Sequence, residues 1–306
     1  ITPENGLLIE SSSLLCEVSF DCLMYQEAEA ILGKSHREFG YDFPIRFDFL
    51  DTFDGGNLSL QCHPRLQYIK DNFGESFTQE ETYYILDTKD NAIVYLGFCE
   101  NYESTTFKNE LEKSCNTKKP FNPESFILKH YVKKHDLMLI PYGTIHGSGK
   151  NNLVLEISTT PYIFTFKMYD WLRPDLEGNV RTLNIERGME NLFPERKGNY
   201  VTDKLKARPV LLDEGPDWKQ YLLQTHETHS YQIHRYHFRS TIDIKTNNKF
   251  LVLSLTEGKS IELETATGFN RSFSYAETFV ISAAAESVRI FNKSPHDAIL
   301  IKAFMK

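Results

Sequence analysis

The run LSLQCHP, at residues 58–64, contains two side chains that could bind a metal. On a β-strand, residues two apart share a face, so Gln61 and His63 point the same way and Cys62 points to the other side. Imidazole nitrogen and amide oxygen are both metal donors. Taken singly, such a pair on a strand usually has no function, so its interpretation depends on what else the chain supplies.

Two more candidate ligands come later in the chain. Glu81 stands at the start of the strand-like run TYYILD, where an acid can face a barrel interior. In IPYGTIHG, Pro and Gly make a tight turn that delivers His146 onto the next strand. Two imidazoles, one carboxylate and one amide oxygen suit a borderline metal such as zinc. Because an amide is a weaker ligand than a third imidazole or a thiolate, the set predicts a Lewis-acidic, catalytic site rather than a structural one.

Composition limits the classes of partner. The 306 residues are 41% hydrophobic and 25% charged, with a formal net charge of -8, which is ordinary for a soluble globular protein and argues against a nucleic-acid surface. No apolar run is long enough to span a bilayer. The five cysteines are scattered and contain no CxxC, which favours a reduced, cytoplasmic setting over a disulfide framework. We expect a monomer or weak oligomer whose partner is a small molecule.

Short β-rich runs bounded by Asp, Asn, Gly and Pro must position these residues. A helix is expected around residues 105–114 and another after Pro64. The many short strands predict two β-units, each a barrel or sandwich, joined by a polar connection with a little helix near its start. The expected strands are 82–87, 92–98, 153–157, 162–168, 230–238, 250–255, 260–263, 278–281, 287–292 and 298–304.

Five segments resemble the type I mannose-6-phosphate isomerases, in particular the short bacterial form with two cupin domains. The resemblance is strong from about Phe43 to Glu186 and weaker through the C-terminal β-unit; the family's Trp-Gly-Gly opening is not visible. The segments are FPIRFDFLD (43–51), LSLQCHP (58–64), EETYYILD (80–87), LIPYGTIHGSGKNNLVLEIS (139–158) and KMYDWLRPDLEGNVRTLNIE (167–186).

The resemblance implies a mainly β fold of two double-stranded β-helix (cupin or jelly-roll) units with a few short helices. It divides the chain into a metal-binding catalytic cupin domain (1–185), a linker with some helix (186–225) and a C-terminal cupin-like domain (226–306). It further implies one zinc ion per chain, held by residues that match the family's ligands. These are Gln61, His63, Glu81 and His146, with Glu80 as the neighbouring alternative to Glu81.

The family also implies an activity, the isomerisation of mannose 6-phosphate to fructose 6-phosphate in carbohydrate metabolism. Glu156 matches an active-site acid and is expected either to move the proton between C2 and C1 or to orient a ligand histidine. Lys167 is expected to hold the anionic or hydroxylated end of the substrate. The retained Ser59, Tyr169 and Asp170 complete the expected substrate wall, although simple core packing is the other interpretation of Tyr169.

Three positions depart from the family's basic wall for the phosphate. Asp48 and Gln79 stand where the family has lysines, and Lys167 stands where it has an arginine. A phosphate dianion requires Lys, Arg or helix N-terminal amides around it. Other cations could substitute from other directions: Arg46, Arg65, Lys150, Arg173 and Arg181.

Three alternatives stay open. The first is a zinc isomerase that acts on a different or unphosphorylated sugar, and the second is a non-catalytic sugar-binding or regulatory cupin. A cupin dioxygenase is the third, although such enzymes use iron and usually more histidines than this set contains.

A second group of histidines lies in HETHSYQIHRYHF. We expect this segment to be an exposed polar loop feeding a strand, with His234 and His237 on opposite sides of that strand. A surface or rim role is predicted for the group, which comprises His226, His229, His234 and His237.

Overall fold

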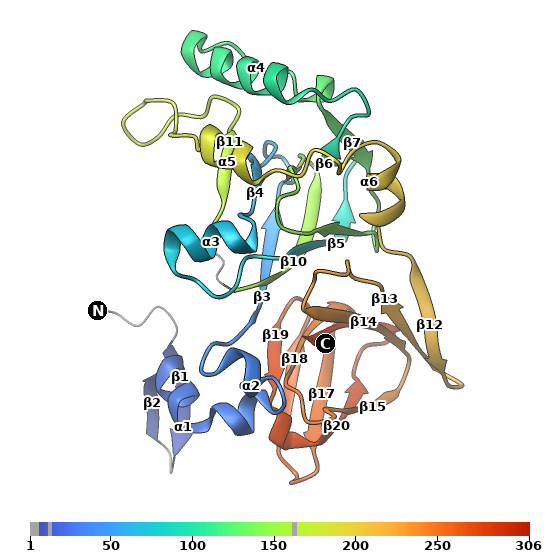
Figure 1. Ribbon diagram of the computed structural model, residues 1–306. Helices are drawn as coiled ribbons and strands as arrows, with labels where there is room; N and C mark the ends of the chain where they lie inside the picture. The colour runs from blue at the N-terminus through green and yellow to red at the C-terminus, as the bar shows by residue number, and fades with distance from the viewer. Residues whose placement is uncertain (1–5, 12–13, 161–163) are drawn as a thin grey trace. The chain divides into compact units, whose positions relative to one another are not determined.

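The computed structural model describes residues 6–11, 14–160 and 164–306 (Figure 1). It divides the chain into two compact units, and neither unit is one continuous segment. The unit made of residues 46–209 and 223–230 contains the four expected metal ligands, Gln61, His63, Glu81 and His146, and is called the metal-cluster unit for that expectation. The terminal unit contains residues 1–45, 210–222 and 231–306.

The N-terminal residues show where this division differs from the predicted ranges 1–185, 186–225 and 226–306. Residues 1–45 group with the C-terminal strands, whereas the sequence prediction placed them with the metal-binding domain. Within the terminal unit, Gly33 forms an isolated β-bridge with Lys249. Sequence patterns are local and carry no sign of this long-range pairing. The predicted boundaries, as limits of independently folding domains, stay a prediction.

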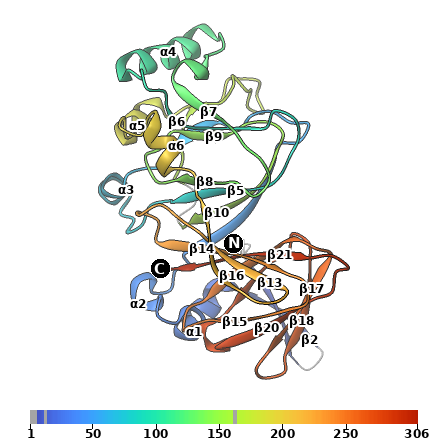
Figure 2. The same cartoon turned by 90° about the vertical axis from the view of Figure 1, so that its right-hand side faces the viewer.

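The metal-cluster unit consists mainly of two sheets, with strand orders β3-β10-β5-β8 and β11-β4-β9-β6-β7 (Figure 2). Their strands are β3 (Ile45–Asp51), β4 (Leu60–Cys62), β5 (Glu81–Thr88), β6 (Ile93–Phe98), β7 (Ile127–Tyr131), β8 (Leu137–Ile140), β9 (His146–Ser148), β10 (Asn152–Thr159) and β11 (Phe166–Tyr169). The predicted strand at residues 162–168 lies partly outside the described residues; of its described part, residues 164 and 165 are not in a strand and residues 166–168 belong to β11.

Strand β5 explains why this unit holds together. Its first six residues are all buried, because β5 pairs with β10 on one side and with β8 on the other. Tyr83 and Ile85 belong to an apolar cluster with Val94 from β6. The phenol of the buried Tyr84 contacts His135 Nδ1 at 2.7 Å, so its polar end is not left unpaired.

The helices of this unit follow local sequence signals. They are α3 (Leu66–Phe73), α4 (Ser104–Thr117), α5 (Ile185–Asn191) and α6 (Asn199–Lys204), with a short 3-10 turn at Pro123–Ser125. The carboxylate of Glu103 accepts hydrogen bonds from the backbone amides of Thr105 and Thr106 and so caps α4. The helices predicted after Pro64 and around residues 105–114 are confirmed as α3 and α4.

The terminal unit contains a six-stranded sheet in the order β12-β13-β14-β21-β16-β19 and a four-stranded sheet in the order β15-β20-β17-β18. An N-terminal hairpin and two helices complete it: β1 (Gly6–Ser11), β2 (Leu14–Ser19), α1 (Phe20–Leu32) and α2 (His36–Phe39). The sheet strands are β12 (Pro209–Glu214), β13 (Trp218–Leu223), β14 (Tyr231–Phe238), β15 (Thr241–Lys245), β16 (Leu251–Glu257), β17 (Ser260–Thr265), β18 (Asn270–Ser274), β19 (Thr278–Ile281), β20 (Ser287–Asn292) and β21 (Ala298–Met305), with a 3-10 turn at Ala283–Ala285.

The predicted fold class is confirmed: the chain is mainly β, with two double-stranded β-helix units and a few short helices. Each strand predicted in the second half of the sequence is present. In the described part of the chain, no helix combines the length and the apolar character that crossing a bilayer requires.

Candidate metal centre

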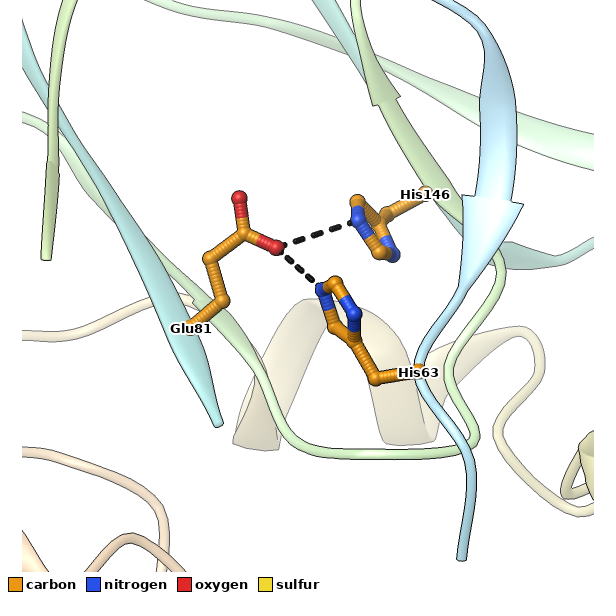
Figure 3. Close-up of side chains that lie close together, drawn as sticks. All are labelled: His63, Glu81 and His146. Carbon is orange, nitrogen blue, oxygen red and sulfur yellow. Dashed lines mark hydrogen bonds and ion pairs between the residues drawn. The ribbon is translucent and has the colours of Figure 1, made fainter. Parts of the chain in front are cut away.

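Three of the four predicted ligands converge inside the metal-cluster unit (Figure 3). The donor atoms of His63, Glu81 and His146 all lie within 4.8 Å of one another, and all three residues are buried. The Glu81 carboxylate points between the two rings, with Oε2 at 2.5 Å from His63 Nε2 and 3.2 Å from His146 Nε2. Two imidazoles and one carboxylate in this arrangement can hold a divalent transition metal.

The two sheets bring these residues together. Glu81 is the first residue of β5, whereas His146 is the first residue of β9 in the other sheet. Gln61 on β4 is the direct cross-strand partner of His146. Directly opposed residues point to the same face, so Gln61 and His146 face the cluster while Cys62 packs into the apolar cluster behind β4. Burial raises the pKa of the Cys62 thiol to about 12, which keeps it protonated.

Backbone carbonyls fix the orientation of both histidine rings. His146 Nδ1 lies 2.9 Å from the carbonyl oxygen of Thr144, and His63 Nδ1 lies 3.3 Å from that of Phe164. A carbonyl can only accept, so each Nδ1 carries a proton and each Nε2 is directed at Glu81. This is the outer-shell arrangement that metal-binding histidines use.

The charge state of Glu81 fits a ligand. Burial alone would raise its pKa, but the charge of His146 and hydrogen bonds from His146 and His63 outweigh burial and hold the pKa well below its ordinary value. Glu81 is therefore ionised, as a metal ligand must be. The neighbouring Tyr83 phenol stays protonated, because burial and the charges of Glu81 and Glu156 raise its pKa.

The turn that carries His146 is fixed by its backbone contacts. Gly143 has φ +72°, a conformation that favours glycine, and its N–H donates to the carbonyl of His63 at 2.8 Å. The buried Arg196 guanidinium donates to the carbonyl of Pro141 at 3.0 Å and to Thr144 Oγ1 at 2.6 Å. The turn is thereby tied both to His63 and to Arg196, a residue that nothing in the sequence pattern singles out.

A close approach of two strands explains the glycine after His146. A Cβ on Gly147 would lie 2.7 Å from the backbone oxygen of Ser59, so a larger residue would push β9 away from the segment that enters β4. The same Ser59 donates its hydroxyl hydrogen to Gln61 Oε1 at 2.8 Å. The Gln61 amide nitrogen lies 3.4 Å from His146 Nε2, so the amide borders the cluster.

A carboxylate and a guanidinium lie next to the cluster. Glu156 on β10 is the cross-strand partner of Tyr83, which places it on the face that also carries Glu81. Arg46 Nη1 is 3.8 Å from Glu156 Oε1, and Arg46 Nη2 is 2.6 Å from Asp48 Oδ2. Burial and the charge of Glu81 raise the pKa of Glu156, and the charge of Arg46 opposes this rise.

The predicted substrate-binding residues fall into two groups. Lys167 is half-buried and is the cross-strand partner of Gln61, so it lies beside the ligand row. Tyr169 packs in an apolar cluster and its hydroxyl oxygen accepts the N–H of Phe121 at 3.2 Å. The buried Asp170 forms ion pairs with Arg173 and Arg181, as part of the loop that follows β11. The contacts of Tyr169 and Asp170 are those of structural residues, and their predicted substrate contacts stay predictions.

Of the five cations considered as replacements for the family's basic wall, Arg46 is the one that contacts Glu156. The Nε–H of Arg65 donates to the carbonyl of Asn191, the last residue of α5, at 3.0 Å. Arg173 and Arg181 bind Asp170, and Lys150 is exposed. Arg46 is therefore the candidate that the geometry singles out.

Glu80 faces away from the cluster. Its Oε2 lies 3.1 Å from His229 Nε2 and accepts from Thr228 Oγ1 at 3.2 Å, on the segment 223–230. Glu81, and not Glu80, thus meets the two cluster histidines.

The expectation of an exposed loop around the second histidine group is wrong for its first two members. His226 and His229 are both buried. His226 contacts the Tyr200 hydroxyl at 3.2 Å, and His229 pairs with Glu80. His234 and His237 lie in one strand, β14, and their odd separation puts them on its opposite sides, as predicted; His234 lies beside Gln220 and His237 against the ring of Tyr221. None of the four belongs to a metal-type cluster within the described residues.

Comparisons with known proteins agree with the sequence resemblance, although no family model matches the chain. Bacillus subtilis (strain 168) contributes three of the curated relatives, including the following two. Its probable mannose-6-phosphate isomerase GmuF is 33% identical over 164 residues, which are 51% of this chain and 48% of that relative. Its mannose-6-phosphate isomerase ManA is 24% identical over 227 residues, which are 72% of this chain and 64% of the relative. The match with GmuF thus spans about half the length of that relative.

Solved structures show the same fold. The mannose 6-phosphate isomerase from Bacillus subtilis superposes with a TM-score of 0.75 at 19% identity, over 96% of this chain and 83% of that chain. A mutant phosphomannose isomerase from Salmonella typhimurium superposes with a TM-score of 0.74 at 13% identity, over 98% of this chain and 88% of that chain. Together with the curated relatives, these matches confirm the resemblance to the type I mannose-6-phosphate isomerases.

Proposed function

We propose that this relative of the mannose-6-phosphate isomerases is a zinc-dependent aldose–ketose isomerase that interconverts mannose 6-phosphate and fructose 6-phosphate. The observation that carries the proposal is the convergence of His63, Glu81 and His146 in a buried site, beside the wall that contains Glu156. The names of the relatives support this substrate.

The residues present fit zinc. Two Nε2 atoms and an ionised carboxylate are its preferred donors, and the Gln61 amide is placed to add a fourth. Turning that amide by 180° would direct Oε1 at the cluster and leave its nitrogen to donate to Ser59 Oγ, which can also accept. When bound, zinc would polarise the sugar carbonyl and stabilise the charge that develops on its oxygen.

A second observation supports the fit. The hydroxyl of Ser158 is buried and has no hydrogen-bond partner among the described residues. Ser158 is the cross-strand partner of Glu81, so it lies on the same face of the sheet. An unpaired buried hydroxyl is costly, and a group that occupies the cluster would offer it a partner.

Glu156 is proposed as the base. The carboxylate takes a proton from C2 of the open-chain aldose to give an enediol and returns it to C1, while a second proton passes from O2 to O1. The competing role, orienting a ligand histidine, is already filled, because the carbonyls of Thr144 and Phe164 hold the two Nδ1 atoms. This leaves the Glu156 carboxyl for the substrate.

Lys167 and Arg46 are proposed to hold the phosphate. Lys167 extends the row formed by Gln61 and His146, and the Arg46 guanidinium lies in the wall beside Glu156. Asp48 forms an ion pair with Arg46 and so neutralises part of the positive charge that a phosphate would need. This observation favours an unphosphorylated sugar as the second candidate substrate.

The test is an assay of the purified protein with mannose 6-phosphate and, separately, with mannose, each with and without a chelator. The His63→Ala variant is assayed beside the wild type, and bound metal is measured in both. Turnover of mannose 6-phosphate that the chelator and His63→Ala abolish is expected. Turnover of mannose alone would select the second substrate, and stoichiometric metal without turnover of either sugar would indicate a binding protein. A cytoplasmic location and a monomeric or weakly associated state stay predictions.

A further inference from the structure

The terminal unit contains a cavity of about 300 Å³ that the proposed isomerase chemistry does not use. Its strands β13, β14 and β21 are neighbours in the six-stranded sheet (Figure 2). The residues of interest in its lining are Gln220, His234, Tyr236, Lys249, Lys302 and Phe304.

Lys302 is a buried cation with a neutral partner. The residue is 6% exposed, and its Nζ donates to the Tyr236 hydroxyl oxygen at 3.0 Å. The rings of Tyr236 and Phe304 lie 5.2 and 5.0 Å from Nζ. Within residues 6–11, 14–160 and 164–306, no carboxylate lies within ion-pair distance of Lys302. Burial without a counter-charge lowers the pKa of Lys302 to about 8.

His234 places a second basic group opposite Lys302. The two residues are cross-strand partners on β14 and β21. Gln220 Nε2 lies 2.8 Å from His234 Nδ1, and because an amide nitrogen only donates, the ring carries its proton on Nε2. Burial and then the charge of Lys302 lower the pKa of His234 to about 4, so it is a neutral donor at pH 7.

Lys249 adds a third basic group. Its Nζ donates to the carbonyl of Met305 at 2.8 Å and lies 5.5 Å from the centre of the Phe304 ring. Burial, followed by the charge of Lys34, lowers the pKa of Lys249.

The acidic groups near the cavity do not balance these charges. Asp243 and Lys245 line the cavity from β15, but the Asp243 carboxylate accepts both Nε and Nη2 of Arg289, at 2.8 and 3.3 Å. Asp213 on β12 acts on Tyr236, where it adds to burial in raising the pKa of the phenol. A buried ammonium without an anion is unfavourable, so the cavity has the electrostatics of an anion site.

We propose that this cavity binds a small oxyanion, the phosphate or carboxylate group of a metabolite, against Lys302, with donors from Tyr236, His234 and Lys249. The anion would supply the counter-charge that the surrounding strands lack. The site is independent of the metal cluster and of the proposed isomerase activity.

The test uses the whole protein with carbon-13 in its lysine side chains, titrated with sulfate or with acetate. Both probes keep a constant charge from pH 7 to pH 9.5, so any change in affinity over this range comes from the titration of groups on the protein. The Lys302 signal is identified by its absence in Lys302→Met, and Lys259→Met, on an exposed residue of the same unit, is the matched control.

We expect a saturable shift of the Lys302 signal and a Lys302 titration midpoint that rises above about 8 in saturating anion. Affinity should fall by more than tenfold from pH 7 to pH 9.5, since the binding-competent protonated form becomes rare. Tighter binding of sulfate identifies a phosphate-type ligand, and tighter binding of acetate identifies a carboxylate. Tyr236→Phe, which keeps the lysine and the ring, should weaken binding severalfold and serves if Lys302→Met does not fold.

Two results would overturn the proposal. One is a Lys302 signal that neither anion shifts in a saturable way. The other is an affinity that stays constant up to pH 9.5, because that behaviour belongs to surface lysines with ordinary pKa values.

Discussion

Arg46 contacts Glu156 across the wall of the metal-cluster unit: Nη1 lies 3.8 Å from Oε1. Adjacent strands supply the two side chains, since β3 pairs with β10. The guanidinium also pairs with Asp48 on its own strand, at 2.6 Å. Arg46 is therefore shared between the proposed base and an acid on its own strand.

Replacing Asp48 should improve the binding of a phosphorylated substrate. In Asp48→Asn the carboxylate no longer competes for Arg46 or repels the phosphate, so we expect KM for mannose 6-phosphate to fall roughly threefold to tenfold, which corresponds to about 1 kcal/mol. Steady-state kinetics measure this, with the exposed Asp54→Asn as the control. An equal fall in KM for mannose would contradict the phosphate explanation.

Glu80 and Glu81 form a natural control pair for metal binding. Glu81→Gln removes the carboxylate between the two histidines, and we expect the affinity for metal to fall roughly tenfold or more. Glu80→Gln changes a neighbour that faces His229 instead, so bound metal should remain near one per chain. Elemental analysis after dialysis measures both variants. Loss of metal in Glu80→Gln together with its retention in Glu81→Gln would reject the ligand assignment.

Arg196 should control the stability of the turn before His146. Arg196→Met removes the buried guanidinium that donates to the Pro141 and Tyr142 carbonyls and to the Thr144 hydroxyl oxygen. We expect the free energy of unfolding to fall by roughly 2 to 4 kcal/mol, with weaker metal binding because His146 is less well held. Denaturant titration measures the first effect. An unchanged midpoint would show that the turn does not depend on this guanidinium.

Lys302 predicts a rise in stability at alkaline pH. Its pKa falls from 10.5 to about 8 on folding, so between these values the unfolded chain holds the proton that the folded chain has lost. The unfolded state therefore binds more protons, and this group's contribution to stability increases from pH 8 to pH 10.5, by roughly 3 kcal/mol in all. Unfolding free energies of the wild type and Lys302→Met, compared across this range, isolate the effect. A constant difference between them would mean that Lys302 titrates normally.

The sequence predicted which side chains converge around Glu81 because the signals for them are local. Strand alternation placed Gln61 and His63 on one face, and the turn before His146 is encoded by its own Pro and Gly. The same alternation could have found Tyr83, two residues after Glu81. Helix α1 also had a signal that was missed, since its buried Met24, Ala28 and Leu32 recur every four residues.

Other features depend on distant pairing and carry no local sign. Arg196 reaches a turn more than fifty residues away. His229 looked like part of a polar loop, but its burial depends on Glu80 from another part of the chain. Lys302 faces His234 only through the register of β14 with β21. Sequence periodicity shows on which face of a strand a side chain lies, but it does not show which residue of a distant segment lies opposite that side chain.

Strand β21 occupies an interior place in its sheet, between β14 and β16. During synthesis, β14 and β16 are made before residues 298–305 exist, so their hydrogen-bonding edges toward the missing strand stay open until then. The metal-cluster unit has all its segments by residue 230. The terminal unit, whose first segment precedes the metal-cluster unit in the chain, is thus completed after it. The open edges of its strands are where misassembly during synthesis would begin.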